Sequence, residues 1–244
     1  MLFFVMDAIG FACRYSFITN KLDYCGKTGA FTELLDYIQA PKKEKQEKVC
    51  ELLSSFFGLH SYLQLIAESN KKNWLDFDVL EAYWLGNNLL ENIRHREFQR
   101  TILSLQNFGL PRDIAEKKAV FLPRNLLPQH SAHVLHVNFI TQKLAPIEKN
   151  LSNCLIQWAQ VQGQKFDGRI IAKGIELFSQ NNEFVLREKN KLLQNPFSLQ
   201  AEKRDFVSVH WNNAIALLEE HQLENLKKFT LQNIHAVNSA KTIP

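Results

Sequence analysis

The feature that most constrains the fold is a change in the spacing of apolar residues near residue 150. Before this point apolar side chains recur every three or four residues, as Leu80, Tyr83 and Trp84 do, which is the spacing of one helix face. After it, apolar and polar residues alternate, as in "DFVSVHW" at 205–211, which is the pattern of a half-buried strand. The sequence therefore predicts an α+β protein with helices first and strands later.

Several segments in the first 150 residues have helical spacing, and prolines such as Pro111, Pro123 and Pro128 separate them. Within the second of these segments, Gly58 is expected to mark a break or a point of close packing. The expected helices cover 29–39, 47–68, 76–93, 113–122 and 131–144. These segments predict a mainly α-helical domain over residues 1–150.

The chain after residue 150 is expected to form short strands followed by a helix. The expected strands are 154–162, 168–177, 183–190 and the "DFVSVHW" segment, and the expected helix is about 213–236. A few short strands in an open sheet would leave their edges unpaired, so a small closed β-barrel of the OB or SH3-like type is the favoured arrangement. Residues 151–244 are thus predicted to be a small β-barrel domain with a C-terminal helix.

The composition indicates which kinds of partner and which cellular compartment to expect. The formal net charge is only +4, and the densest lysine run, at 41–48, is interrupted by glutamates, so no nucleic-acid partner is expected. No run of about 20 apolar residues spans a membrane, and the apolar start meets Asp7 without a preceding basic region. The four cysteines form no C-x-x-C pair and are expected to be thiols of a reducing compartment. These features predict a cytoplasmic protein with no membrane association.

Two stretches after residue 150 resemble HypC/HupF-type hydrogenase-maturation chaperones. They are "CLIQWAQV" at 154–161, which opens with the cysteine, and "RDFVSVHWNNAIALLEEHQLENL" at 204–226. In this chain Cys154 is internal, whereas the cysteine of that family stands at the start of the chain. The positions that match are Asp205, Val207, Val209, His210, Ala214, Ile215 and Leu218.

This resemblance implies a non-catalytic accessory or chaperone protein in the maturation of a metalloenzyme. Its partner would be a hydrogenase large subunit or a maturation scaffold protein, and partner contacts would involve Cys154, His210 and Trp211. The Cys154 thiolate would hold iron or nickel transiently, since a thiolate is a soft, strongly donating ligand. The burial of a small apolar residue is the alternative interpretation of Cys154.

The part before residue 150 resembles an uncharacterised bacterial family, largely actinobacterial. The stretches that carry this similarity are "LDYCG" at 22–26, "VLEAYWLGNNLLENI" at 79–93 and "HSAHVLHVNF" at 130–139. Its members continue into the same strand-rich region, ending in a "VSLHW"-type strand. No activity comes with this similarity.

Three histidines form the pattern H-x-x-H-x-x-H and are candidate metal ligands together with Cys154. They are His130, His133 and His136, and all three would converge only if His130 lies in the loop before a helix that carries the other two. An alternative function is therefore a metal-dependent enzyme with a histidine-rich site in the helical domain. A structural role for these histidines is the competing interpretation.

His210 alternates with Val209 and Trp211 and is expected to face away from both. If the valines point into the barrel, His210 faces solvent or the helical domain, where a hydrogen-bonding role at the junction is expected. The absence of a known catalytic signature in the sequence favours the non-enzymatic functions, including a purely structural module. The sequence names neither a client protein nor a metal.

Overall fold

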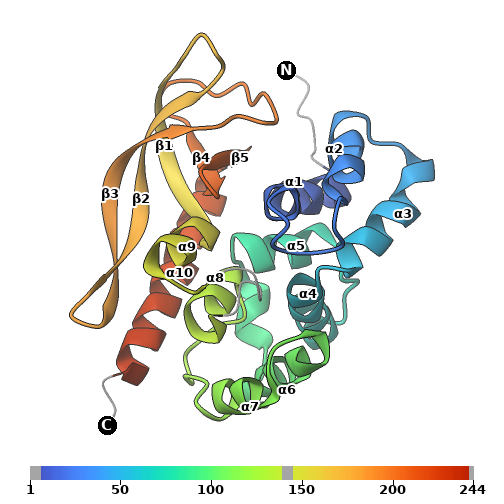
Figure 1. Ribbon diagram of the computed structural model, residues 1–244, viewed down its shortest axis with the longest axis vertical. Helices are drawn as coiled ribbons and strands as arrows, with labels where there is room; N and C mark the ends of the chain where they lie inside the picture. The colour runs from blue at the N-terminus through green and yellow to red at the C-terminus, as the bar shows by residue number, and fades with distance from the viewer. Residues whose placement is uncertain (1–6, 139–144, 242–244) are drawn as a thin grey trace.

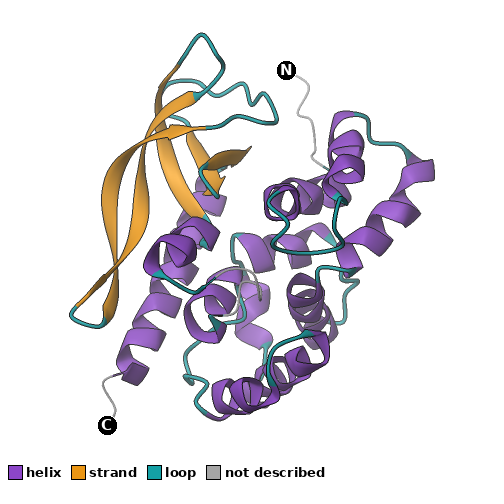
Figure 2. Ribbon diagram, viewed as in Figure 1, coloured by secondary structure: helices purple, strands orange, loops and turns teal. Residues whose placement is uncertain are grey.

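The computed structural model describes residues 7–138 and 145–241 of the 244-residue chain. It confirms the α+β class, with helices in the first part, then a sheet, then a C-terminal helix (Figures 1 and 2). The helices before the sheet are α1 (Ala8–Lys21), α2 (Phe31–Gln39), α3 (Lys43–Ser54), α4 (Phe57–Asn70), α5 (Phe77–Trp84), α6 (His95–Ser104), α7 (Arg112–Val120), α8 (His130–Ala132) and α9 (Glu148–Cys154). Two 3-10 turns, η1 (Asn88–Asn92) and η2 (Leu105–Phe108), and one π-helical turn, η3 (His133–Val137), complete the helical part.

Two of the expected helices are interrupted, the first at residues 55–56 just before Gly58 and the second at Gly86. The segment expected to be one helix at 47–68 is two, α3 and α4, and Gly58 in α4 lets the ring of His133 approach closely, since a β-carbon there would lie 3.4 Å from that ring. The segment expected at 76–93 ends its α-helix at Trp84, because Gly86 has a left-handed φ of +90°. A β-carbon on Gly86 would also lie 2.4 Å from the Phe229 ring, so only glycine fits this position.

Two parts of the sequence analysis fall on residues that the structure does not describe. The expected helix at 131–144 is described only as far as Asn138, and its remainder lies outside the described residues. The apolar start of the chain, at 1–6, lies outside them as well. Among the helices within 7–138 and 145–241, none is both long enough and apolar enough to cross a bilayer.

The strands form an antiparallel sheet in the order β3-β2-β1-β4-β5. They are β1 (Gln157–Gln164), β2 (Ile170–Gln180), β3 (Glu183–Leu193), β4 (Phe206–His210) and β5 (Asn213–Leu217). In the described residues the edge strands β3 and β5 do not pair along their length, so the sheet is open and the predicted barrel closure is not confirmed. One parallel bridge, between Gln194 and Asn213, brings the end of β3 to the start of β5, which shows that the sheet curls towards closure at one end.

The prediction of a helix over 213–236 was wrong at its beginning. Residues Asn213–Leu217 form strand β5, and helix α10 runs over Glu220–Lys241. The apolar residues at 214, 215, 217 and 218 fit either a helix or a strand, so their spacing alone does not decide. The turn decides, because Trp211 and Asn212 both have positive φ (49° and 59°), the backbone of a two-residue hairpin loop.

Helix α10 holds the helical part and the sheet together. Asn233 accepts from the Leu127 amide (2.8 Å) and donates to the Leu127 carbonyl (3.0 Å), and Asn238 makes the same pair of bonds to Phe184 of β3 (2.8 Å each). One hydrophobic core contains residues from both sides of residue 150, Trp84 and Phe229 among them. The division into domains at 1–150 and 151–244 stays a prediction, since the two parts share this core.

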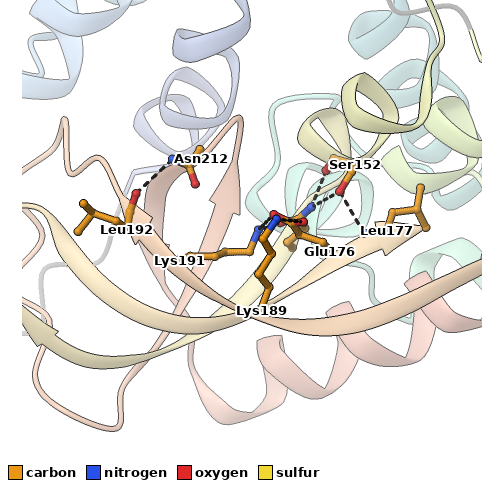
Figure 3. A network of polar contacts seen from close by, with 8 residues as sticks. Ser152, Glu176, Leu177, Lys189, Lys191, Leu192 and Asn212 are labelled. Atoms are coloured by element: carbon orange, nitrogen blue, oxygen red, sulfur yellow. Dashed lines mark hydrogen bonds and ion pairs between the residues drawn. The ribbon is translucent and has the colours of Figure 1, made fainter. Parts of the chain in front are cut away.

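A polar network fixes helix α9 on the sheet (Figure 3). The Ser152 hydroxyl accepts from the amide of Leu177 (3.0 Å) and from the Gln157 side chain (3.2 Å). Gln157 accepts from the Lys191 ammonium (2.9 Å), which also pairs with Glu176 (3.3 Å). We call Ser152, Gln157, Glu176 and Lys191 the Lys191 network; it fixes the helix whose last residue is Cys154.

Candidate functional site

Three of the candidate residues, His130, Cys154 and His210, meet where α8, α9 and β4 come together. In Figure 1, α8 and α9 lie near the lower end of the sheet, while α1 lies beside β5. One ligand atom from each of the three side chains lies within 4.8 Å of the others, and all three residues are buried. We call these residues the metal-ligand cluster.

His130 opens helix α8 and has polar contacts at both ring nitrogens. Its Nδ1 lies 3.0 Å from the Tyr83 hydroxyl and its Nε2 lies 2.9 Å from the Cys154 carbonyl oxygen. A carbonyl oxygen only accepts, so Nε2 carries the proton and donates to it, and Nδ1 accepts from the Tyr83 hydroxyl. Metal binding through Nε2 would require the proton to move to Nδ1, which would then donate to Tyr83. Burial, with the nearby His210 as a smaller contribution, holds the pKa of His130 well below its usual value, so the ring is neutral.

Cys154 ends helix α9, and its sulfur lies 3.9 Å from His130 Nε2. The residue is only 5% exposed. Burial raises the pKa of its thiol above the ordinary value, so without a metal the sulfur is protonated. The structure shows the sulfur inside the molecule rather than on an outer face.

His210 is the last residue of β4 and turns towards the helical part, away from Val209, as the alternation predicted. Its Nδ1 lies 3.2 Å from the Tyr15 carbonyl oxygen, so Nδ1 carries the proton and donates. The Nε2 atom is buried and, within the described part of the chain, makes no hydrogen bond of good geometry, although the Cys154 backbone lies near enough to act on the pKa of the ring. Burial lowers the pKa of His210 to about 4. A buried acceptor without a partner is costly, and a metal ion is one group that would complete it.

The distance between the Cys154 sulfur and the His130 Nε2 is close to that of two ligands on one tetrahedral metal ion. Zinc bonds are about 2.3 Å to a thiolate and about 2.0–2.1 Å to an imidazole, so a sulfur and a nitrogen on one zinc ion lie about 3.6 Å apart. The observed 3.9 Å between Cys154 Sγ and His130 Nε2 is only a few tenths of an ångström longer. Both histidines have a hydrogen-bond partner on the second ring nitrogen, the arrangement that orients metal-bound imidazoles in proteins.

The structure separates the other two histidines of the H-x-x-H-x-x-H pattern. His133 lines the same cavity as the cluster, although it is not one of the three residues whose ligand atoms converge. His136 is outside the cluster, because its Nε2 donates to the Lys118 carbonyl (2.7 Å) on the side of α7. The turn between them is π-helical, so three residues advance less around the axis than in an α-helix, and the two side chains do not share a face.

Trp211, predicted as a partner contact, packs inside the junction between the sheet and the helical part. Its ring lies against Tyr24 with centroids 4.8 Å apart, and its amide donates to the Asn153 carbonyl (2.8 Å). The residue is partly exposed, and its role with a partner stays a prediction. Of the residues predicted for partner binding, Cys154 and His210 lie in the metal-ligand cluster instead.

The cluster lies at the inner end of a cavity of about 340 Å³. Its buried walls include Tyr83, Trp84 and Leu59, and its outer lining includes Phe57 (49% exposed) and Phe108 (43% exposed). The rings of these two phenylalanines stack with centroids 4.6 Å apart. The cavity is therefore a passage from a surface aromatic pair to the three candidate ligands.

The sequence analysis missed His210 as a candidate metal ligand and Tyr83 as the hydrogen-bond partner of His130. His130 and Cys154 are 24 residues apart in the chain, and Tyr15 and His210 are 195 apart, so sequence spacing carries no sign of their contact. The alternation around His210 did show that it faces away from the valines. The orientation of His210, together with the position of Cys154 at the start of the strand region, was the sequence evidence that the two residues could lie close together.

The cluster is poorly suited to nucleophilic catalysis by Cys154. Burial keeps the thiol protonated, and the described residues that line the cavity include no lysine or arginine to favour a thiolate. Cys154 also lies at the C-terminal end of its helix, where the dipole disfavours negative charge. A metal ion supplies the missing positive charge and takes the sulfur as a thiolate.

The comparisons with known proteins give a family without a function. The sequence model of DUF6390, described as a family of unknown function, matches residues 8–243. No curated protein and no solved structure matches the chain. The expected similarity to an uncharacterised family is thus supported, whereas the resemblance to hydrogenase-maturation chaperones is not.

Proposed function

Since the chain belongs to DUF6390, a family of unknown function, we propose from its site alone that it is a metal-dependent enzyme with a zinc-type ion held by His130, Cys154 and His210. The observation that carries the proposal is the convergence of these three buried ligands at the end of a cavity, with the His210 lone pair left without a partner in the described residues. Catalytic zinc sites hold the ion with three protein ligands and leave a fourth position for water or substrate.

The donor set limits the metal. One thiolate and two imidazoles suit zinc, iron, nickel or copper, while magnesium and calcium prefer carboxylate and carbonyl oxygens. Zinc fits the tetrahedral spacing described above and is the ion that we propose. An ion at this position would act as a Lewis acid towards a molecule in the cavity, where few waters compete with it.

The site favours this function over the accessory role implied by the chaperone resemblance. An accessory protein that hands a metal fragment to a client needs its cysteine within reach of another protein's surface. Cys154 is buried and lies at the inner end of a narrow passage, behind Phe57 and Phe108. Such a position suits a small molecule that enters the cavity better than a protein partner.

Metal stoichiometry and affinity test the ligands. Wild-type protein is expected to retain one zinc ion per chain after dialysis, by elemental analysis. Cys154→Ser and His210→Gln should each weaken zinc binding at least ~100-fold, the upper end of the loss for a merely supporting partner. Cys50→Ser and His136→Gln are the matched controls and should bind zinc as wild type does. Substoichiometric zinc in wild type, or wild-type affinity in Cys154→Ser, contradicts the site.

Exchange at the fourth position separates an enzyme from a structural zinc protein. In cobalt-substituted protein, added imidazole should change the visible spectrum, because it replaces a weakly held water on the metal. Imidazole is neutral at alkaline pH and small enough for the passage. A spectrum that does not respond to imidazole would show a closed metal site, and the enzyme proposal would then be wrong even if zinc binds.

A further inference from the structure

The chemical character of the cavity is set by its lining, which is aromatic and without formal charge. Of the lining residues that the structure describes, none is lysine, arginine, aspartate or glutamate. The polar groups are imidazoles, thiols, hydroxyls and backbone, and His130, Cys154 and His210 among them form the metal-ligand cluster. The lining residues are Thr19, Tyr24, Cys25, Gly26, Ser55, Phe56, Phe57, Gly58, Leu59, Tyr83, Trp84, Leu105, Phe108, Gly109, Leu110, His130, His133, Cys154 and His210.

A lining of this kind discriminates strongly against ionised ligands. A phosphate or carboxylate moved into the cavity would lose its hydration and find no oppositely charged side chain among the described lining residues. Charged side chains do line a second cavity of the described chain, since Lys21, Asp167 and Arg169 lie on it. The absence of ionised side chains beside the cluster is thus a property of this cavity and not of the whole surface.

The walls also favour a flat ring. Trp84 packs its ring against that of His130, with centroids 4.8 Å apart, and the Phe57 and Phe108 rings are nearly parallel, at 11°. Aromatic rings attract one another at centroid separations of 4.5–7 Å in stacked or edge-on arrangements, so a planar ligand gains contacts here that a flexible chain would not. The volume of about 340 Å³ is at the small end of the range for small-molecule sites and excludes a folded peptide.

We propose that the ligand of this cavity is a small, uncharged aromatic molecule whose one polar group faces His130, Cys154 and His210. The inference rests on the proposed function in one respect, since it takes the metal-ligand cluster as the place where that polar group is held. The body of the molecule lies against the aromatic walls of the cavity, and the preference for an uncharged ligand comes from the lining itself.

Two probe molecules that differ mainly in charge test whether the cavity excludes ionised ligands. 1-Naphthol and 1-naphthyl phosphate share one ring system and differ in the ionised phosphate, and both are fluorescent. 1-Naphthol should bind to wild-type protein at least ~100-fold more tightly than the phosphate, because an ionised group without a partner costs several kcal/mol to bury. The comparison is made on metal-free and on zinc-loaded protein, so that a phosphate bound to zinc is recognised as such.

Two variants locate the binding. Gly58→Leu adds a side chain that points towards His133 inside the cavity, and Gly58 lies in helix α4 without a left-handed φ, so a larger residue is compatible with the backbone. It should lower 1-naphthol affinity at least ~10-fold while Gly163→Ala, at a glycine outside the cavity lining that also has no left-handed φ, leaves it unchanged. Phe108→Arg places a cation at the exposed mouth and should reduce the preference for 1-naphthol over the phosphate.

The outcomes separate this inference from the proposed function. Tight 1-naphthol binding to protein that takes up no zinc would support the ligand class and contradict the metal-dependent enzyme. Stoichiometric zinc with equal affinity for 1-naphthol and its phosphate in metal-free protein would overturn the ligand class alone. Failure of 1-naphthol to bind, or equal binding to wild type and to a folded Gly58→Leu variant, would also overturn it.

Discussion

Two buried polar clusters share helix α9. They differ in whether other protein groups supply hydrogen-bond partners for all of their polar atoms. In the Lys191 network, Ser152, Gln157 and Lys191 bond to one another and to Glu176 and the Leu177 amide. In the metal-ligand cluster, which begins two residues further along α9, the His210 Nε2 makes no hydrogen bond among the described residues, and the Cys154 sulfur has a long contact to His130 and one to the Trp211 side chain. The first cluster is a structural joint, and the second has bonding capacity left for a ligand.

The difference also shows in what surrounds each cluster. The Lys191 network holds an ammonium against a carboxylate, and hydrogen bonds from Lys189 and Lys191 lower the pKa of Glu176 although its partial burial acts to raise it. The metal-ligand cluster lies on a cavity with no ionised side chain in its described lining. Buried polar groups cost free energy unless they are satisfied, so an unsatisfied cluster beside a cavity points to function.

The largest expected effect is stabilisation by zinc. A ligand that binds only the folded state stabilises it by about 4 kcal/mol when its free concentration is about 1,000 times the dissociation constant. The free energy of unfolding of wild-type protein in urea should rise by about this amount with zinc, and that of His210→Gln should not change. Equal stabilisation of both proteins would place the zinc elsewhere on the chain.

The next largest effect is a loss of stability at low pH that comes from His136, whose Nε2 donates a hydrogen bond to the Lys118 carbonyl. Burial lowers its pKa to about 4, from about 6.5 in an unfolded chain. Below pH 6.5 the unfolded state takes up a proton that the folded state refuses, so this contribution to stability is complete above pH 6.5 and is lost as the pH falls towards 4. The shift of about 2.5 units corresponds to a loss of about 3 kcal/mol.

Urea unfolding of wild type and His136→Gln at pH 7 and pH 4 measures this loss. The variant should lose less stability between the two pH values than wild type does, by up to the figure above. Similar losses in both proteins would show that His136 is protonated in the folded state and that burial does not hold it neutral.

Lys191→Met should cost about 1–3 kcal/mol in the free energy of unfolding, because it leaves Gln157 and Glu176 without a buried partner. The side chain of Lys191 is 7% exposed, whereas that of Lys189, which pairs with the same carboxylate, is 56% exposed. Lys189→Met is therefore the matched control and should change stability by less than about 1 kcal/mol. Zinc affinity should be unchanged in both, and a tenfold loss in Lys191→Met would mean that the two clusters are not independent.

The smallest effect is expected from Tyr83→Phe, which removes the hydroxyl that contacts His130 Nδ1. Loss of a partner that orients a metal-bound histidine typically weakens metal binding ~10–100-fold, and about tenfold is expected here. Tyr62→Phe is the control, since the Tyr62 hydroxyl is equally buried but has no partner within the described residues. Equal zinc affinities for the two variants would remove Tyr83 from the site.

The sequence was sufficient for the fold class and for most element positions, because periodicity reports which face of each segment is buried. It failed at 213–217, where the apolar spacing fits a helix and a strand equally and the hairpin turn at Trp211 and Asn212 decides. It also could not show whether the sheet closes, since closure depends on how far the strands curl together and not on the pattern within any one strand.

For the site, the sequence singled out all three ligands but divided them between two roles. Cys154 and His130 were expected to bind metal, and His210 was expected to form a hydrogen bond at the junction with the helical part, as it does with Tyr15, or to contact a partner. Local spacing cannot show that β4 passes beside α8. The correct part was the direction of His210, which follows from its alternation with Val209. The π-helical turn that separates His133 from His136 left no sign in the sequence pattern.

X-ray absorption at the zinc edge of the loaded protein tests the metal-ligand cluster most directly. The metal-ligand cluster predicts a first shell with one sulfur at about 2.3 Å and two imidazole nitrogens at about 2.0–2.1 Å, with one further light atom from water. The sulfur should vanish from the shell of Cys154→Ser protein. A wild-type first shell of nitrogen and oxygen alone would contradict the site.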